Sequence, residues 1–191
     1  VVTNLDYQSQ VIDYSRKRVI AVGRICPQKG FDRLLQVWSS LVSRYSDWEL
    51  VIVGAEAPDE KRYCAEFLSM PEWQTIGDSV KILQPAGNIL DYYRSASIYV
   101  MPSRWEGFPM VLLEAMASGL PVVSFDCPNG PGEMIVHGEN GYLIGDGDLG
   151  AFAEHLALLM ANQDLRERLG QSACRIRGDY CWERIEPQWE A

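Results

Sequence analysis

Short runs of apolar residues alternate along the chain with longer stretches in which apolar residues recur every three or four positions. Short runs bounded by turn residues are typical of buried strands, and the longer spacing is typical of amphipathic helices. The predicted strands are 19–22, 50–54, 80–83, 98–101, 121–125 and 141–144. The predicted helices are 31–44, 60–69, 89–96, 109–118, 149–160, 164–177 and 181–189, with one helical turn at 132–136.

Strands and helices that alternate in this way form a parallel sheet with helices on both faces and right-handed crossovers. We therefore expect an α/β fold, a Rossmann-like doubly wound parallel sheet, as one domain over residues 18–180. Residues 1–17 are predicted as an incoming linker, and residues 181–191 as a C-terminal helix. In such sheets the ligand crevice lies beyond the carboxyl ends of the strands. The candidate loops follow Val22, Val53, Leu83, Met101 and Phe125.

The stretch after the fourth predicted strand combines a helix start with two carboxylates. Pro109 suits the first helical position, because its fixed φ fits the turn and its missing N–H costs nothing there. The amides of Met110 and Val111 are then expected to point out of the helix start, where unpaired donors and the helix dipole favour an anion. Glu114 lies one turn further on the same face, and Glu106 precedes the helix. This layout matches a sugar joined through a diphosphate to a nucleoside.

The loop after the first predicted strand brings two cations to the same edge of the sheet. It reads GRICPQKG over residues 23–30. It is not a Walker A loop, because Lys29 is followed by Gly30 rather than by Ser or Thr, and it is not a Gly-x-Gly-x-x-Gly loop. Arg24 can form bidentate hydrogen bonds to phosphate oxygens, and Lys29 can attract the phosphate as a point charge. Together with the helix start, these two cations predict an anion site.

Composition and charge narrow the class of partner. The 191 residues, 47% of them hydrophobic, suit one folded domain with a substantial core. The net charge of −9 disfavours a nucleic-acid surface, so a few local cations must hold any phosphate. The five cysteines show no zinc spacing, and their odd number argues against a closed set of disulfides, which favours a reducing cytoplasm. No apolar run approaches about 18 residues and no signal-peptide pattern is present, so neither a membrane span nor export is expected.

Two other patterns have structural interpretations. Asp146 and Asp148 form an Asp-x-Asp pair, a pattern that can bind a cation, but Asp148 is well placed as the N-cap of a helix that starts at Leu149. His137 and His155 have no Ser or Cys arrangement near them and are interpreted as structural or solvated. No metal is expected, because the two loop cations already serve a diphosphate.

Several features together resemble the carboxyl-terminal domain of retaining GT-B glycosyltransferases of glycosyltransferase family 4. These are Gly23-Arg24 with Lys29-Gly30, the pair Glu106 and Glu114 separated by seven residues, and the run EAMASGLPVV that begins at Glu114. The resemblance covers nearly the whole chain. The loop FDCPNGP at residues 125–131 also resembles the corresponding loop in bacterial enzymes that build lipopolysaccharide, capsule or O-antigen.

The resemblance implies a domain that binds a nucleotide-sugar donor. It implies that Arg24 and Lys29 hold the diphosphate, with the amides of Met110 and Val111 assisting. These groups would stabilise the negative charge that grows on the leaving diphosphate, so Arg24 and Lys29 are candidate catalytic residues.

The resemblance also implies contacts with the rest of the donor. Glu114 would bind the ribose hydroxyls, and Glu106 would lie close to the transferred sugar. Gly107 and Phe108 would line that sugar, and Leu83 would meet the base through its backbone. Glu106 is the third candidate catalytic residue: it would position the sugar and favour the oxocarbenium-like centre, or act as a covalent nucleophile as in retaining glycosidases. The positioning role is favoured, because no second carboxylate stands out as the acid.

The expected protein is the donor-binding half of a cytoplasmic retaining glycosyltransferase. It would move a hexose from a nucleotide-diphosphate sugar, with UDP favoured, to a saccharide or glycolipid acceptor in bacterial surface polysaccharide or lipopolysaccharide biosynthesis. A missing N-terminal domain would bind the acceptor, and the C-terminal helix would cross to it, so this chain alone would bind nucleotide but transfer little. No cofactor is expected, and peripheral attachment to the inner face of the membrane stays open. The alternatives are a GT-B sugar-nucleotide epimerase or phosphorylase, and a non-catalytic nucleotide-sugar-binding module.

Overall fold

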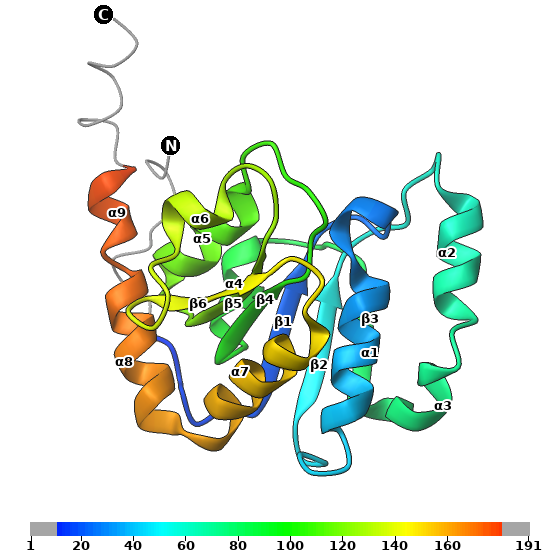
Figure 1. Cartoon of the computed structure of the whole chain (residues 1–191), viewed down its shortest axis with the longest axis horizontal. Helices are drawn as coiled ribbons and strands as arrows, with labels where there is room; N and C mark the ends of the chain where they lie inside the picture. The colour runs from blue at the N-terminus through cyan, green and yellow to red at the C-terminus, as the bar shows by residue number, and fades with distance from the viewer. Residues whose placement is uncertain (1–10, 181–191) are drawn as a thin grey trace, which may run out of the picture.

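A parallel sheet of six strands, in the order β3-β2-β1-β4-β5-β6, runs through the part of the chain that the computed structural model describes, residues 11–180 (Figure 1). The strands are β1 Arg18–Val22, β2 Glu49–Val53, β3 Val80–Leu83, β4 Ile98–Met101, β5 Val122–Asp126 and β6 Gly141–Gly145. Neighbouring strands pair in parallel throughout. Every predicted strand is confirmed, with its bounds shifted by no more than about one residue, which is within the usual scatter of such assignments.

The helices follow the predicted order with two differences. They are α1 Phe31–Leu41, α2 Lys61–Leu68, α3 Glu72–Ile76, α4 Ile89–Arg94, α5 Met110–Ser118, α6 Pro131–Met134, α7 Leu149–Ala161, α8 Gln163–Ala173 and α9 Ile176–Asp179. The predicted helix 164–177 is interrupted between α8 and α9. The pattern does not predict α3, because a helix of 5 residues is too short to show a helical repeat.

Helices cover both faces of the sheet, and the alternation along β4 shows how the two cores divide. Ile98 and Val100 point into the core shared with α1 and α7, whereas Tyr99 and Met101 point into the core shared with α4 and α5. In Figure 1, α1 and α7 lie in front of the sheet and α4 and α5 lie behind it. All four residues of β4 are buried, as expected of a parallel strand that is covered on both sides. The Rossmann-like doubly wound fold is confirmed.

The strand order reverses between β1 and β4, and the ligand crevice of a doubly wound sheet lies at such a reversal. Two predicted loops meet there, residues 23–30 after β1 and residues 102–109 after β4. They touch at Gly30, where a Cβ atom would lie 2.1 Å from the carbonyl oxygen of Pro102. The amide of Arg104 also donates to the carbonyl of Gln28 at 2.8 Å. The fold therefore holds the two loops in direct contact.

The segment that enters the domain is fastened to the far end of α5. The hydroxyl of Tyr14 donates to the carbonyl of Gly119, the residue that caps α5, at 2.8 Å. The guanidinium of Arg166, which is buried, donates twice to the carbonyl of Tyr14, at 3.0 Å and 2.6 Å. Gly170 packs so closely that a Cβ atom would lie 2.3 Å from the carbonyl oxygen of Gly119. The carboxyl end of α5 is therefore held by two segments of the chain, the incoming one and α8.

The predicted domain boundaries fall partly outside the described residues. Residues 11–17 of the predicted linker are described, and Ile12 among them is buried in the core that contains α5. Residues 1–10 and the predicted C-terminal helix at 181–191 lie outside the described residues.

Candidate functional site

An ion pair joins the two crevice loops at their centre. The ammonium of Lys29 contacts Oε1 of Glu106 at 2.8 Å, and the two side chains are only 15% and 6% exposed. The side chain of Lys29 runs across Gly23, where a Cβ atom would lie 3.0 Å from its stem, so the glycine leaves room for this path. The predicted cation and the predicted carboxylate therefore meet directly over the carboxyl ends of β1 and β4.

Two further side chains hold the Glu106 carboxylate. The hydroxyl of Ser103, itself buried, donates to Oε1 at 2.6 Å. The amide nitrogen of Gln28 lies 3.5 Å from Oε2 and donates to the carbonyl of Trp105 at 3.0 Å. Neither Ser103 nor Gln28 is among the predicted site residues. A hydroxyl placed three residues before a carboxylate is a sequence signal that points to Ser103.

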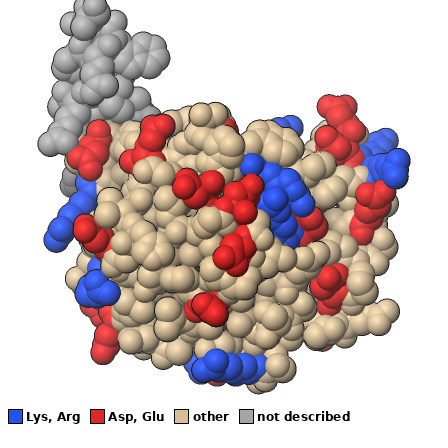
Figure 2. Space-filling model, viewed as in Figure 1, with Lys and Arg blue, Asp and Glu red and all other residues tan. Residues whose placement is uncertain are grey.

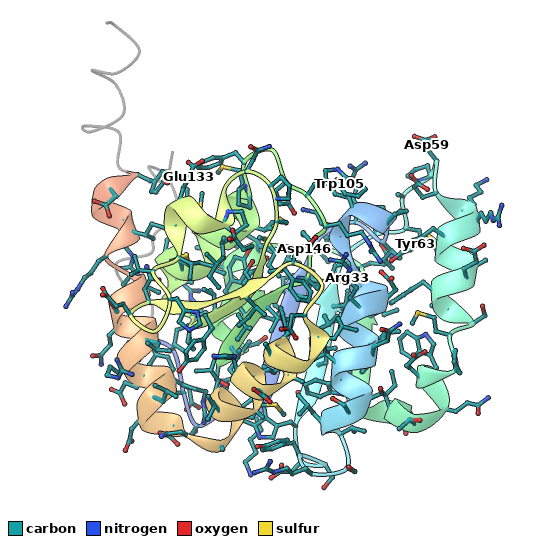
Figure 3. The ribbon with its side chains drawn as sticks, viewed as in Figure 1. Arg33, Asp59, Tyr63, Trp105, Glu133 and Asp146 are labelled. Atoms are coloured by element: carbon teal, nitrogen blue, oxygen red, sulfur yellow. The ribbon has the colours of Figure 1, made fainter. Side chains whose placement is uncertain are left out.

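A second ion pair ties the same loops to α1 and α2. The guanidinium of Arg104 donates to both carboxylate oxygens of Asp32, at 2.8 Å and 2.5 Å, and the hydroxyl of Tyr63 donates to Asp32 at 2.8 Å. Burial opposes ionisation of Asp32, but the hydrogen bonds from Arg104 and Tyr63 outweigh it and lower the pKa of Asp32. Figure 3 shows Tyr63 beside the upper end of α1, close to the crevice. This pair holds the loop after β4 against α1 and α2, beside the crevice.

The lowered pKa of Asp32 predicts a pH-dependent contribution to stability. Because the folded-state pKa lies below the unfolded one, the stabilisation is present above the unfolded value and is lost as the pH falls below about 4. We expect Asp32→Asn to be less stable than the wild type at pH 7 by about 2 kcal/mol, and the difference to shrink in acid. Urea unfolding of both proteins at pH 7 and at about pH 2.5, below the unfolded-state pKa, measures it. A difference that does not change with pH would contradict this account.

Arg24 and Arg33 differ in whether their guanidinium groups are paired with a carboxylate. The side chain of Arg24 is exposed, and within residues 11–180 it has no ion-pair partner. Arg33 is bound to Asp146 at 2.7 Å, and its guanidinium lies over the ring of Phe125. Figure 3 shows Arg33 and Asp146 side by side, and Figure 2 shows basic and acidic side chains adjoining at this place. Of these two arginines, Arg24 is the one available to a ligand.

The prediction that Pro109 occupies the first helical position is wrong. Pro109 is the N-cap, with ψ of 78°, and its carbonyl accepts hydrogen bonds from the amides of Leu112 and Leu113 at 2.9 Å and 3.2 Å. The proline ring fixes φ but leaves ψ free, so the residue serves the cap as well as the first turn. Its ring packs on the next loop, where a Cβ atom at Gly130 would lie 2.2 Å away. The helix therefore begins one residue later, at Met110.

This shift changes which amides face the crevice. The amide of Met110 donates to the carbonyl of Phe108 at 2.9 Å. The amide of Val111 has no hydrogen-bond acceptor within the described part of the chain. One of the two predicted amide donors is therefore engaged in a turn, and Val111 is the donor that remains for an anion.

Glu114 lies further along α5 and is half-buried. The hydroxyl of Tyr93 donates to its Oε2 at 3.1 Å and also approaches the carbonyl of Val111 at 3.2 Å. Burial raises the pKa of Glu114, and the hydrogen bond from Tyr93 opposes this rise. Burial, with Glu106 and Glu114 nearby, also raises the pKa of Tyr99. Both carboxylates therefore lie near the same buried tyrosine, although they differ in exposure.

Apolar side chains surround the crevice. Three predicted site residues with apolar side chains are exposed: Leu83, Phe108 and Met110. Trp105 is also exposed, although it is not among the predicted site residues. Figure 3 shows Trp105 at the upper edge of the molecule, above the start of α1. The ring of Phe108 contacts that of Tyr180, which follows α9, with centroids 5.8 Å apart. Exposed aromatic and aliphatic groups of this kind suit contact with a sugar, a base or a second protein surface.

Gly107 is placed between Glu106 and Phe108 in an open position. A Cβ atom there would meet nothing within 4 Å among the described residues. The glycine therefore leaves the backbone accessible beside the carboxylate, as its predicted place next to the sugar requires.

The structural interpretation of Asp148 is confirmed. Its carboxylate accepts from the amide of Ala151 at 2.9 Å and caps α7. His137 and His155 pack with Tyr142 in a cluster of three rings, and each donates from Nδ1 to a backbone carbonyl. Among residues 11–180, no group of three or more His, Cys, Asp or Glu side chains could hold a metal ion. No helix in that range is long and apolar enough to cross a membrane.

A hollow of about 560 Å³ lies at the opposite edge of the sheet, near the amino ends of β1, β2 and β3. Each cation that lines it already contacts a carboxylate of the protein. Arg18 and Lys81 share Glu49, at 2.6 Å and 2.8 Å, Lys17 contacts Asp47, and Arg16 contacts Asp13. The crevice over β1 and β4, which has Arg24, unpaired within the described residues, in one of its loops, therefore remains the candidate site.

The solved structures that this chain resembles are glycosyltransferases. A mutant of TarM from S. aureus, in complex with fondaparinux, α-GlcNAc-glycerol and UDP, superimposes with a TM-score of 0.84 at 25% identity, over 94% of this chain and 35% of that one. The C-terminal domain of a group 1 family glycosyl transferase (LpcC) from Francisella tularensis superimposes with a TM-score of 0.79 at 23% identity, over 93% of this chain and 98% of that one. The fold is that of one half of a GT-B glycosyltransferase.

Residues 3–175 match the family model of the group 1 glycosyl transferases, and the chain belongs to this family. It is 37% identical over 186 residues to the amylovoran biosynthesis glycosyltransferase AmsD of Erwinia amylovora, covering 97% of this chain and 50% of that protein. It is 34% identical over 183 residues to an uncharacterized glycosyltransferase of Haemophilus influenzae, covering 96% of this chain and 50% of that protein. The chain spans about half the length of the curated relatives it matches.

Proposed function

We propose that this domain binds the nucleotide-diphosphate sugar donor of a retaining glycosyltransferase. The observation that carries the proposal is the contact of Lys29 with Glu106 at the reversal of the sheet. The exposed Arg24 lies in the same loop as Lys29, and the free amide of Val111 lies in the first turn of the helix that follows the loop of Glu106. A diphosphate fits a site of this kind, because two cations and a helix start complement its charge. UDP is the favoured nucleotide, supported by the UDP bound in the TarM structure.

The proposed chemistry follows from charge. As the bond between the anomeric carbon and the phosphate oxygen breaks, negative charge grows on the leaving diphosphate. Arg24, Lys29 and the amide of Val111 are the donors that would stabilise this charge more in the transition state than in the ground state. No metal or other cofactor is required in this scheme, because the protein's own donors balance the charge.

The carboxylates are proposed to hold the two sugars of the donor. Glu114, half-buried and bonded to Tyr93, would accept hydrogen bonds from the ribose hydroxyls. Glu106 would position the transferred hexose, with Gly107 and Phe108 beside it, and Leu83 would present its backbone to the base. The contacts that Glu106 makes with Lys29 and Ser103 support a positioning role over that of a covalent nucleophile, because they occupy Oε1.

Calorimetric titration of this chain with UDP, GDP, ADP and their common sugars tests the donor assignment. We expect Arg24→Ala and Lys29→Ala each to weaken nucleotide binding by about 1.5–3 kcal/mol, the range for charge-assisted hydrogen bonds. Arg62→Ala, which removes an exposed cation of α2 paired within its own helix, is the control and should bind normally. An unchanged affinity for Arg24→Ala or Lys29→Ala would remove that residue from the site.

The acceptor and the cellular role are proposed from the relatives. The names of AmsD and of a lipopolysaccharide core biosynthesis mannosyltransferase, LpsB of Rhizobium meliloti, support transfer of a hexose to a saccharide or glycolipid acceptor in a bacterial surface glycan. We propose a cytoplasmic location for the full-length protein, with peripheral attachment to the membrane, and an N-terminal domain of the same chain that binds the acceptor. This chain alone should then bind nucleotide but transfer little.

Two other classes of function remain to be separated by assay. A sugar-nucleotide epimerase and a phosphorylase share the GT-B architecture, and a nucleotide-sugar-binding module without turnover would keep the fold. Parallel assays of the complete protein for net transfer, epimerisation and phosphorolysis distinguish them. Net transfer to an acceptor supports the proposal, and binding without any turnover supports the module.

A further inference from the structure

The carboxylate of Glu106 is already bound to groups of this chain before any ligand arrives. Oε1 receives the ammonium of Lys29 at 2.8 Å and the hydroxyl of Ser103 at 2.6 Å. Glu106 and Lys29 are held in loops that are fixed to each other, and their side chains are largely shielded from water. The pair is therefore a defined contact within the free domain and not a mobile surface contact.

This contact affects the cation that is proposed to bind the diphosphate. An ammonium has three donors, and at least one of them is directed at Glu106. Attraction between opposite charges at this separation is strong where water is partly excluded, and the carboxylate also repels an incoming anion. A diphosphate must therefore share Lys29 with Glu106 or replace Glu106 as its partner.

We propose that Glu106 restrains Lys29 in the free domain, and that the diphosphate of the donor takes over the ammonium from Glu106 when it binds. Ser103 stays on Oε1 and Gln28 near Oε2, and they hold the carboxylate in place, so that the acceptor site of Oε1 that Lys29 leaves becomes available to the sugar that follows the diphosphate. Glu106 thereby acts as a positioning residue for Lys29 that lowers the affinity for the nucleotide. The inference rests on the proposed function, because it assigns an order of contacts within that same site.

The test is the affinity of this chain for UDP and for inorganic pyrophosphate, measured by calorimetry. Glu106→Gln keeps the shape of the side chain and an acceptor for Ser103 but removes the charge that holds Lys29. We expect it to bind both ligands about 3- to 10-fold more tightly than the wild type, the scale of one ion pair in a partly solvated site. A side chain that only maintained the fold would show weaker binding or no change.

A double-mutant cycle shows whether the effect acts through Lys29. In the Lys29→Ala background, Glu106→Gln is expected to give no further gain, because the ammonium that it would release is absent. A gain that persists in that background would mean that Glu106 acts by general repulsion, and it would overturn the handover of Lys29. Glu154→Gln is the control: it removes an exposed carboxylate of α7 that has no ion pair within residues 11–180, and it should change affinity less than about 2-fold.

The outcomes also separate this inference from the proposed function. If the wild type binds none of UDP, GDP, ADP and pyrophosphate, the proposed function fails. If the wild type binds, Lys29→Ala weakens binding, and Glu106→Gln binds no better than the wild type, only this inference is overturned. Thermal unfolding confirms that each variant is folded.

Glu106→Asp is the second variant. Its shorter side chain keeps the charge but places the carboxylate further from Lys29, so it too should bind both ligands more tightly than the wild type.

Discussion

Replacing Glu106 or Glu114 by alanine in the complete enzyme is expected to remove most of its transfer activity. Each change should lower kcat/KM by about 100-fold or more, because loss of a positioning contact near the reacting atoms misplaces the donor. The reasons differ between the two residues. Glu106→Ala removes the partner of Lys29 and Ser103, whereas Glu114→Ala removes the acceptor that faces Tyr93. The measurement is steady-state transfer with the nucleotide sugar that calorimetry selects.

A conservative variant of Glu114 separates its effect on binding from its effect on stability. Glu114 has a raised pKa, so its charge is unfavourable in the free domain, and Glu114→Gln should fold at least as stably as the wild type at pH 7 while it binds nucleotide more weakly. Glu154→Ala, at an exposed position of α7, is the control for transfer and should retain full activity. Undiminished turnover in both Glu106→Ala and Glu114→Ala would discard the assignment of these carboxylates.

Replacing Gly30 by alanine is expected to have the largest effect on stability. Gly30 has φ of 64°, and its added Cβ atom would lie 2.1 Å from the carbonyl oxygen of Pro102. The methyl group therefore forces apart the two loops that build the crevice. We expect a loss of about 3–5 kcal/mol in the free energy of unfolding, the sum of a left-handed backbone penalty and a backbone clash. Urea unfolding of the purified domain measures it.

Gly147→Ala is the matched control for Gly30→Ala. Gly147 also has a left-handed φ, of 80°, but a Cβ atom there would meet nothing within 4 Å in the described structure. It should cost about 1–2 kcal/mol, the backbone penalty alone. Equal losses for the two variants would show that the contact between the loops does not limit the packing at Gly30.

The sheet could be predicted from the sequence because its strands are short, buried on both faces and bounded by turn residues. β4, with every residue apolar, is an example. The helix α3 could not be predicted, since it is too short to show a repeat, and the predicted helix 164–177 missed the break between α8 and α9, which leaves the apolar spacing nearly unchanged. Local pattern therefore specifies the strands better than it specifies the ends of helices.

The site was only partly predictable. Arg24, Lys29, Glu106 and Glu114 are indicated by residue type and by their place after strands, and their roles stay predictions. The partnership of Lys29 with Glu106 joins residues 77 positions apart, which no local pattern contains. The same holds for Arg104 and Asp32, which are 72 positions apart. The burial of Glu106 is likewise a product of two loops that meet in space.

The helix α5 joins the crevice to the place where the chain enters the domain. Its amino end carries the free amide of Val111, and its carboxyl end, about 13 Å away, is clamped between Tyr14 and Gly170. A helix of this length moves as a rigid body, so a displacement of the incoming segment would reorient the amide of Val111 and the side chain of Glu114 together. Substitutions at Tyr14 or Gly170 should thus alter donor affinity without approaching the ligand.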